Sequence, residues 1–383
     1  TGVMGGVAGP TAAQLAVMHK GDYVYHARDG QLSNVTAQKV ALPRDPVGQC
    51  QGMALTKSDD GVLWADTGDL LHKSVDDGRT WATRSANHVD KWAFWIAGRG
   101  GALLSFTCES DEGALGPVTI WRSDDEGESF EKLSEIPMDF NGTPHAGHTG
   151  GGAEFGFHRL PDGMLLLGMV PRTMKCGFFD AGPGESMGLY IWRSDDGGRT
   201  WQAPGGPPAL WACEGAATKL PSGRLLATVR YQRPTMPDDP PNMMEIARST
   251  QTFPWKHIFL LESDDHGATW GNFRRLTMHH GQCWGFPIAL ADGTVLVVHD
   301  TRYGPGEPSG RAMVSHDQAA TWSNEAYYLY YGSAVSGYSR SVVLGDGTIV
   351  TLCGTCEHPP AANTWDEMVG NSDHTIIRWR AAQ

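Results

Sequence analysis

Six positions recur at a fixed place in the sequence, and five of them carry side chains that could take part in chemistry or binding. Each stands nine residues before a glycine that separates two short apolar runs. Tyr338 and Glu214 form the sharpest pair among them, because a carboxylate within hydrogen-bond reach can take the proton of a phenol as it attacks. A phenol alone is a poor nucleophile, since its usual pKa is about 10. The full set is Gly52, Trp92, Glu154, Glu214, Trp284 and Tyr338.

Three of these positions lie in a shorter repeat: CQGMA, CEGAA and CWGFP, beginning at Cys50, Cys213 and Cys283. This repeat makes Gln51 the better first member of the set. A surface of Gln51, Trp92, Glu154, Glu214, Trp284 and Tyr338 would suit a carbohydrate, because aromatic faces contact sugar CH groups and polar tips bond hydroxyls. The alternative is that these residues only begin core strands.

Arginines end three of the apolar runs that follow these positions. They are Arg172, Arg230 and Arg302, and Arg311 comes shortly afterwards. Converging guanidinium groups in a chain of net charge −13 indicate a site for a carboxylate, which arginine can grip through two hydrogen bonds. Each could also be an ordinary surface arginine. A neutral nucleophile suits an anomeric carbon that itself carries a carboxylate, because Asp or Glu would be repelled there.

The elements that must position these residues are short strands joined by tight turns. Runs such as 155–170, 217–230, 286–300 and 341–353 are typical of β-hairpins, and a third strand follows each. Recurrence at roughly 50 to 70 residues predicts a β-propeller of four-stranded antiparallel blades. Six turn glycines predict six blades in one domain over residues 1–383, with segments 15–20 and 23–30 closing the ring against the C-terminal blade. A seventh blade from residues 13–42 is the alternative.

An eight-residue pattern, S-x-D-x-G-x-T-W, ends the third strand of most repeats. It occurs at Ser74–Trp81, Ser123–Phe130, Ser194–Trp201, Ser263–Trp270 and Ser315–Trp322, with substitutions in some copies. The Asp can accept backbone N–H bonds, the Gly can take a positive φ, and the aromatic ring can pack between blades. We therefore interpret Asp76, Asp125, Asp196, Asp265 and Asp317 as turn residues and not as catalysts.

The bulk composition excludes several classes of function. A net charge of −13 without a Lys/Arg-rich run argues against nucleic acid and anionic membranes as partners. We expect no membrane insertion, because no apolar stretch reaches the length of a spanning helix. Seven cysteines with a single C-x-x-C, Cys353–Cys356, favour ordinary buried or pairing thiols over a metal or redox site. No cofactor or metal is expected. A start at Thr1 is compatible with a processed, secreted or periplasmic chain.

Taken together, these segments resemble the sialidase superfamily, the Asp-box (bacterial neuraminidase repeat) propellers of glycoside hydrolase family 33. The segment GYSRSVVLGDGTI resembles the family's Tyr-Ser segment, which implies Tyr338 as nucleophile. The segment CEGAATKLPSGRLLATVR resembles the one that carries the Glu partner and the second arginine of the carboxylate-binding triad, which implies Glu214 and Arg230. SGRAMVSHD resembles the third-arginine segment, which implies Arg311, with Arg302 as competitor.

The first repeat departs from this family. Where its members have Arg-Ile-Pro, this chain has CQGMAL, so Gln51 or Gly52 stands in the place of the first arginine. Either Arg172 or Arg44 compensates, or the sugar is not an ordinary sialic acid. The loop that carries the family's acid/base aspartate is short here, which makes Asp69 the candidate, with Asp66 and His72 as alternatives.

The resemblance and the residues together predict an exo-acting retaining glycosidase that hydrolyses a terminal acidic sugar, sialic acid or a related one, from a glycan. Tyr338, Glu214 and Asp69 would be catalytic. One alternative is a glycosidase or lyase for a uronic or deoxy sugar, using Glu154, Glu214 or a histidine such as His145 or His148. The other is a non-catalytic carbohydrate-binding propeller.

Overall fold

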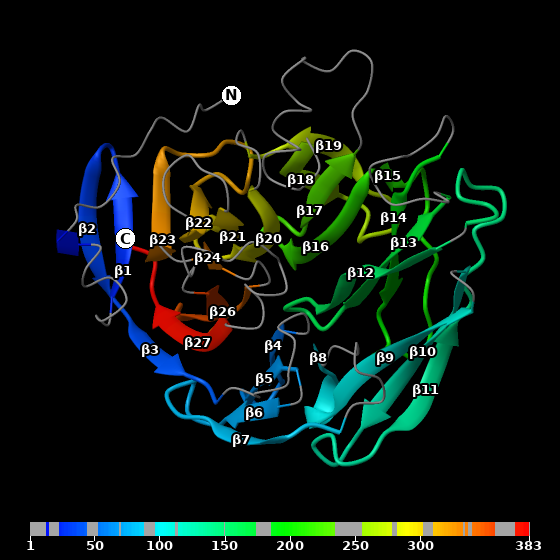
Figure 1. The fold of residues 1–383 in the computed structure, drawn as a ribbon, viewed down its shortest axis with the longest axis horizontal. Helices are drawn as coiled ribbons and strands as arrows, with labels where there is room; N and C mark the ends of the chain where they lie inside the picture. Colours follow the sequence, from blue (N-terminus) through cyan, green and yellow to red (C-terminus); the bar gives the residue numbers. More distant parts are fainter. Residues whose placement is uncertain are drawn as a thin grey trace.

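A computed structural model gives the structure of the chain. It describes residues 13–14, 23–43, 53–68, 70–87, 96–111, 114–148, 150–173, 185–233, 255–277, 282–301, 309–331, 334–335, 339–356 and 372–382. The fold is all-β, with six antiparallel blades arranged around an axis (Figure 1). The prediction of a six-bladed propeller is therefore confirmed. Among the described residues, no helix is long and apolar enough to cross a membrane.

The first three blades follow one another along the chain, and each runs from an inner to an outer strand. Blade 1 contains β4 (Met53–Lys57), β5 (Leu63–Thr67), β6 (Leu70–Ser74) and β7 (Ala82–Ser85). Blade 2 contains β8 (Ile96–Ala97), β9 (Leu103–Asp111), β10 (Ala114–Ser123) and β11 (Glu131–Ile136). Blade 3 contains β12 (Gly150–Arg159), β13 (Leu165–Arg172), β14 (Gly188–Ser194) and β15 (Ala209–Leu210).

The remaining three blades complete the ring. Blade 4 contains β16 (Ala212–Lys219), β17 (Leu225–Arg233), β18 (Trp255–Ser263) and β19 (Gly271–Arg275). Blade 5 contains β20 (Gln282–Ala289), β21 (Val295–Thr301), β22 (Ser309–Ser315) and β23 (Glu325–Tyr331). Blade 6 contains β25 (Arg340–Val343), β26 (Ile349–Cys356) and β27 (Ser372–Trp379), with the short β24 (Ala334–Val335) beside β26.

The N-terminal strands add to two different blades. β3 (Gln38–Ala41) pairs antiparallel with β27 and is the outer strand of blade 6, so the two ends of the chain meet in one sheet. β1 (Tyr23–Arg28) pairs with β23, and β2 (Gln31–Thr36) pairs with β1, so blade 5 has six strands (Figure 1). The residues considered for a seventh blade therefore extend blades 5 and 6.

The core lies between the blades. Buried apolar side chains form one cluster at each junction. Successive side chains of a strand point to opposite faces of the blade, so each face packs against a different neighbouring blade. Leu166, Val170 and Cys213, for example, pack between blades 3 and 4. The aromatic residue of each eight-residue turn joins a junction, as Trp201 does between blades 2 and 3. The expected packing role of these aromatic residues is thus what the structure shows.

The Asp of each eight-residue turn is a hub of hydrogen bonds. Asp196 accepts bonds at Oδ1 from Ser194 Oγ (2.9 Å) and from the backbone N–H groups of Arg199 (3.0 Å) and Thr200 (2.9 Å), and at Oδ2 from Thr200 Oγ1 (2.7 Å). The N–H of Gly198 in turn donates to Ser194 Oγ at 2.9 Å. The residue before this position, which is a glycine in four copies and Ala319 in the fifth, is left-handed in all five: Asp77, Glu126, Gly197, His266 and Gln318 have φ between 55° and 77°.

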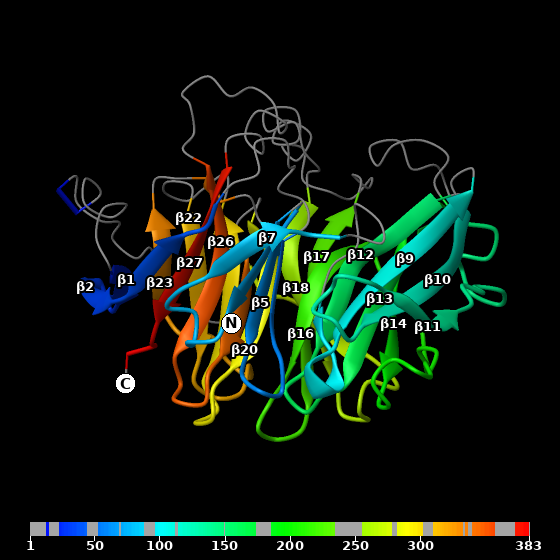
Figure 2. The same cartoon turned by 90° about the horizontal axis from the view of Figure 1, so that it is seen from below.

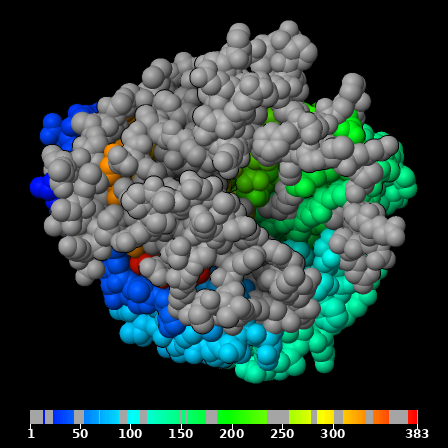
Figure 3. All heavy atoms as spheres, in the orientation of Figure 1, coloured from blue at the N-terminus to red at the C-terminus, as the bar shows by residue number. Residues whose placement is uncertain are grey.

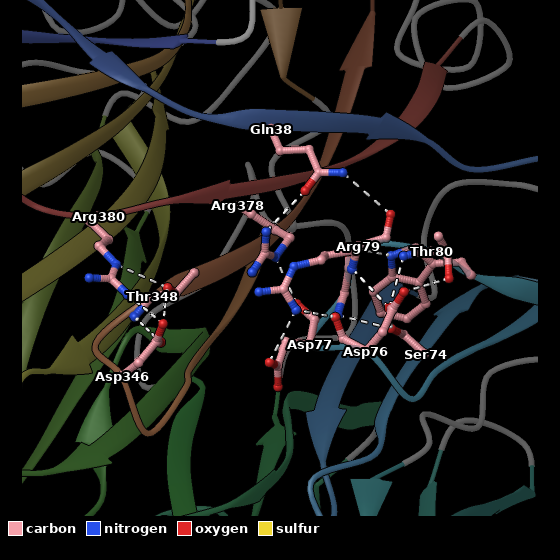
Figure 4. A network of polar contacts seen from close by, with 12 residues as sticks. Gln38, Ser74, Asp76, Asp77, Arg79, Thr80, Asp346, Thr348, Arg378 and Arg380 are labelled. Carbon is pink, nitrogen blue, oxygen red and sulfur yellow. Dashed lines mark hydrogen bonds and ion pairs between the residues drawn. The ribbon is translucent and has the colours of Figure 1, made fainter.

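An arginine from the preceding blade donates to a backbone carbonyl of each of these turns. Figure 4 shows the junction that closes the ring, where Arg378 of β27 donates through Nε to the carbonyl of Asp77 at 2.7 Å. Arg378 also donates to Gln38 Oε1 (2.9 Å), so both terminal strands are bonded to blade 1 through this network. The other four arginine-to-carbonyl contacts are Arg84 to Glu126, Arg99 to Asp195, Arg193 to His266 and Arg274 to Ala319.

The first prediction concerns the turn in blade 3. Asp196→Ala removes the acceptor of four hydrogen bonds and leaves their donors unpaired, so we expect a loss of about 1 to 3 kcal/mol in the free energy of unfolding. The matched control is Asp195→Ala, which removes only an exposed ion pair with His266 and should cost less than about 1 kcal/mol. Urea unfolding measures both. Equal losses would contradict the hub role of Asp196.

The second prediction concerns acid. The Thr269 hydroxyl, with the Thr269 N–H and the Ser263 hydroxyl, lowers the pKa of Asp265 to about 2 from an ordinary 3.8. Because the folded pKa is the lower one, the stabilisation is present above pH ~4 and is lost as the pH falls towards ~2. The Asp265→Asn variant should therefore lose less unfolding free energy than the parent protein when the pH is lowered from about 5 to about 2.5. A variant and parent with parallel pH profiles would refute this linkage.

Candidate functional site

The two ends of the propeller carry different elements. In blades 1 to 5 the hairpin between the first two strands and the eight-residue turn after the third lie at the same end, because the strands are antiparallel. Figure 2 shows the hairpins of the inner strands together at the bottom of the ring. The inner strands therefore begin, and the second strands end, at the opposite end, which faces the viewer in Figures 1 and 3. Figure 3 shows this face hollowed beside the described parts of blades 3 and 4.

Three inner strands are interrupted by a β-bulge close to where they begin. The pairing register shifts between Gly152 and Gly156 in β12, between Ala212 and Gly215 in β16, and between Cys283 and Phe286 in β20. The expected positions Glu154, Glu214 and Trp284 each fall inside such a bulge. A bulge changes the direction of side chains and is common beside active sites. The position nine residues before the hairpin glycine thus falls in a bulge in all three of these blades.

Gly215 explains how the bulge in blade 4 is possible. A Cβ added there would lie 2.0 Å from the carbonyl oxygen of Thr228 and 3.0 Å from the ring of Phe155. Only a residue without a side chain lets β16 approach β17 this closely. The glycine after Glu214 is therefore a requirement of the backbone at the site, and it fixes the direction in which Glu214 leaves the strand.

Glu214 and Arg230 form an ion pair at this end of blade 4. Arg230 Nη1 lies 2.5 Å from Glu214 Oε2, and the two side chains are only 12% and 13% exposed. Arg230 also donates through Nε to Cys213 Sγ at 3.3 Å. Burial raises the pKa of the Cys213 thiol, while Arg230 acts to lower it. The bulge thus gathers a carboxylate, a guanidinium and a neutral thiol in a space largely closed to solvent.

Arg172 joins this group from blade 3. It is the last residue of β13 and shares a strand face with Leu166 and Val170, which pack against Cys213 across the junction of blades 3 and 4. Burial lowers the pKa of Arg172, and the charges of Cys213, Arg230 and Glu214 act on it as well. The structure therefore brings together three of the predicted site residues, Arg172, Arg230 and Glu214, which we call the Arg172–Arg230–Glu214 cluster.

Arg311 has described contacts within blade 5. Its Nε donates to Ser309 Oγ at 2.8 Å, and its guanidinium lies over the ring of Tyr328 at 5.0 Å from the centroid. Burial lowers its pKa, with Tyr328 and Tyr331 acting in the opposite direction. Arg311 is thus a buried cation held by aromatic rings, one blade further round the ring than Arg230.

Trp284 is not the open aromatic platform that the sequence suggested. The ring is 2% exposed and stacks under the guanidinium of Arg340, 4.3 Å from its centroid. Arg340, itself 5% exposed, also lies over Phe286 at 5.5 Å. Burial lowers the pKa of His158 to about 3, and the charge of Arg340 acts in the same direction. Arg340 of blade 6 therefore reaches blades 3 and 5 across the ring.

Sequence reasoning missed Arg340. The signal that could have found it is spacing: Arg340 stands two residues after Tyr338 in an expected strand, and alternate residues of a strand share a face. Gly156, the equivalent residue of blade 3, has a left-handed φ of 91°, and a Cβ there would lie 3.7 Å from Arg340 Nη2. A small residue on one inner strand thus leaves room for the arginine of another.

Several expected residues lie outside what the structure describes. They are Tyr338, Asp69, Arg302, Gln51, Trp92 and Arg44, and for Glu154 only the backbone is described. Of the two alternatives to Asp69, Asp66 is 1% exposed and accepts the N–H of Gly68 at 2.9 Å. His72 bonds the hydroxyls of Thr67 (2.9 Å) and Thr83 (2.8 Å) through its two ring nitrogens.

The environments of His72 and His145 favour structural roles. Burial, with the charge of His374, lowers the pKa of His72 to about 4, so the ring is neutral at neutral pH. His145 is fully buried and bonds Tyr190 Oη (3.0 Å) and Ser186 Oγ (3.1 Å). Both rings have each nitrogen engaged by a neighbouring side chain, which leaves them poorly placed to transfer a proton to a substrate.

The chain is similar in fold to solved structures that include two glycosidases. No protein-family model and no curated protein is similar enough in sequence to match the chain. A Dyadobacter fermentans protein of unknown function has a TM-score of 0.57 at 15% identity, over 90% of this chain and 99% of that one. A Hadza microbial sialidase has a TM-score of 0.55 at 16% identity, covering 85% of this chain and 64% of its own length. An α-L-arabinanase of Penicillium chrysogenum, complexed with arabinobiose, has a TM-score of 0.54 at 15% identity, covering 90% and 98%.

The third prediction tests the bulge that positions Glu214. Gly215→Ala forces a Cβ against the Thr228 carbonyl, so we expect a loss of about 1 to 3 kcal/mol or more in unfolding free energy. Gly345→Ala is the matched control, because a Cβ there meets nothing within 4 Å and should change stability by less than about 0.5 kcal/mol. Thermal and urea unfolding measure both variants. A stable Gly215→Ala protein would show that the close approach of β16 to β17 is not required.

Proposed function

We propose that the protein is a retaining exo-glycosidase that removes a terminal acidic sugar, sialic acid or a related one, from a glycan. The observation that carries the proposal is the Arg172–Arg230–Glu214 cluster at the bulged start of an inner strand, next to an axis around which Tyr338 is expected. The similarity to solved propellers supports a glycosidase fold and does not indicate which substrate is used.

The residues suggest the following chemistry. The hydroxyl oxygen of Tyr338 attacks the anomeric carbon while its proton passes to the Glu214 carboxylate, and the bond from the anomeric carbon to the leaving oxygen breaks. Asp69, or Asp66 in its place, donates a proton to that oxygen. Water then attacks the anomeric carbon of the glycosyl-tyrosine, the same aspartate takes a proton from the water, and Tyr338 leaves with the proton held by Glu214.

The role of the arginines is to bind the carboxylate of the sugar. Arg172 and Arg230 would grip it from blades 3 and 4, and Arg311 or Arg302 would complete the set from blade 5. Guanidinium groups that are largely buried bind a carboxylate more strongly than exposed ones, because less water competes for the same donors. Arg172 would compensate for the arginine that the first blade lacks at Gln51.

A second candidate is a glycosidase for a neutral pentose. It is favoured by Gln51 in the place of an arginine and by the similarity to an arabinanase that was solved with arabinobiose. In this case Glu214 would act directly as an acid or base, and the arginines would bond sugar hydroxyls.

The fourth prediction distinguishes these candidates by the charge of the sugar that is hydrolysed. We expect the parent protein to hydrolyse an α-sialoside or an α-uronide, and Tyr338→Phe to abolish turnover. Glu214→Gln should lower kcat by about 100- to 10,000-fold, the range for general acid–base groups. Arg172→Met should lower kcat/KM by about tenfold to a hundredfold, the value of a charge-assisted contact. Release of the aglycone from chromogenic glycosides measures all of these.

Arg199→Met is the matched control, because Arg199 belongs to the eight-residue turn of blade 3, at the far end of the molecule, where its Nη1 bonds the Asp196 carbonyl. It should leave kcat/KM unchanged. Turnover of an α-L-arabinoside that is insensitive to Tyr338→Phe and Arg172→Met, with no turnover of acidic glycosides, would overturn the proposal in favour of the neutral pentose. No turnover of any glycoside would favour a binding protein.

A further inference from the structure

A groove of about 510 Å³ lies between blades 3 and 4, and its lining does not include the residues of the Arg172–Arg230–Glu214 cluster. It is formed by the outer strands β14 and β15 of blade 3, by parts of β18 and β19 of blade 4, and by the segment 204–208 between them. Figure 1 shows these outer strands on the periphery of the ring. Its volume falls in the range of roughly 300 to 1,000 Å³ that is usual for ligand sites.

The groove differs in charge from the site at the axis. Its lining includes Trp211, Tyr231, Trp270, Asn272 and Phe273, with aliphatic, proline and glycine residues between them, and none of the lining residues that the structure describes is charged. A charged occupant would lose its hydration without gaining an opposite charge. The groove therefore fits a neutral ligand.

Aromatic rings form one wall. Tyr231 stacks on Phe259 with centroids 4.4 Å apart, and Phe273 lies 4.8 Å from Phe259. Phe273 remains 38% exposed, and Leu210 on the other side is 44% exposed. Large apolar side chains that stay open to solvent around a concave surface mark a place where something binds.

Two residues of this wall have unusual backbones. Trp211 has a φ of 60° and Asn272 a φ of 53°. Asn tolerates the left-handed region, but a bulky residue such as Trp does so only at a cost in energy. Asn272 is further fixed by a 2.6 Å bond from Nδ2 to Glu262 Oε2, which orients the amide and leaves Oδ1 as an acceptor on a side chain that lines the groove.

Trp270 differs at this same place from two other tryptophans of the eight-residue turn. The equivalent Trp81 and Trp201 donate their indole N–H to the carbonyls of Gly78 and Gly198, each at 3.1 Å. Trp270 Nε1 is buried and has no hydrogen-bond partner among the described residues. Leaving such a donor unpaired costs about 1 to 3 kcal/mol, so the turn of blade 4 has given up a bond where it lines the groove.

We propose that this groove binds a neutral sugar residue of a glycan. A sugar ring has an apolar CH face that packs on aromatic rings and hydroxyls that bond to amide and indole groups, which matches the uncharged, aromatic and partly polar lining. The proposal rests on the proposed function only in taking a glycan as the ligand. It does not depend on which terminal sugar is cleaved.

The groove and the axial site share the strand β17. Arg230 and Tyr231 are neighbours in β17, and successive side chains of a strand point to opposite faces, so Arg230 belongs to the cluster and Tyr231 to the groove. Trp211 stands three residues before Glu214, directly before β16 begins at Ala212. A sugar held in the groove would tether the glycan close to the site that processes its end.

The experiment uses the full chain with Glu214→Gln, so that no probe is consumed. Isothermal titration with arabinobiose, galactobiose and cellobiose should give saturable binding by at least one disaccharide. Phe273→Ala and Asn272→Gly, the latter keeping a residue that tolerates the left-handed backbone, should each weaken that binding by about tenfold or more. Val75→Ala is the matched control, because Val75 is a 76% exposed apolar residue in the turn of blade 1, and it should leave the affinity unchanged.

Three results would overturn the proposal. One is the absence of saturable binding by any of the disaccharides. Another is binding that Arg172→Met abolishes and Phe273→Ala leaves intact, which would place the sugar at the axis. The third is binding of a decaproline peptide in place of the disaccharides, which would make the groove a peptide site. If the parent protein hydrolyses none of the glycosides but the disaccharide still binds in the groove, only the proposed catalytic function is refuted.

Discussion

The aspartate of the eight-residue turn is the interaction on which the propeller depends. One carboxylate closes the turn by accepting bonds from the Ser that precedes it and from the Thr that follows it, as Asp196 does with Ser194 and Thr200. A closed turn presents its carbonyls outward, and an arginine of the preceding blade donates to one of them. Each turn therefore fastens its own blade and the junction before it. Five of the six junctions have such a bond at this end.

A ring fastened at one end can carry irregular backbone at the other. The bulges of β12, β16 and β20 lie where inner strands begin, and they leave backbone groups out of the regular ladder. Their cost is tolerable because apolar clusters at every junction and the turns below hold the blades in register. The same division explains why Glu214 and Arg230 can be buried together: the strands that carry them are fixed by packing that does not involve them.

The fold was predictable from the sequence because the motifs that specify it are local in the chain. The Asp, Gly and aromatic residue of the turn lie within eight residues, and hairpin glycines mark every blade. The nine-residue count also identified Glu214 and Trp284, since the bulge recurs at the same distance from the hairpin. What local patterns could not give were contacts across the ring. Arg340 stacks on Trp284 from a different blade, and β1 joins blade 5 although it is some 300 residues away in sequence, a pairing that no short pattern encodes.

In the proposed function, an acidic sugar would offset the cost of burying Arg172. Burial lowers its pKa, which means that the charged guanidinium is less well solvated there than in water. A carboxylate ligand would offset that cost through charge-assisted bonds, whereas a neutral sugar would leave it largely in place. The contact between Arg230 and Glu214 does not oppose this, because a guanidinium carries five N–H donors and can serve a carboxylate of the protein and one of a ligand together. Under the proposed function, this cluster would therefore hold an anionic substrate in a chain whose overall charge is strongly negative.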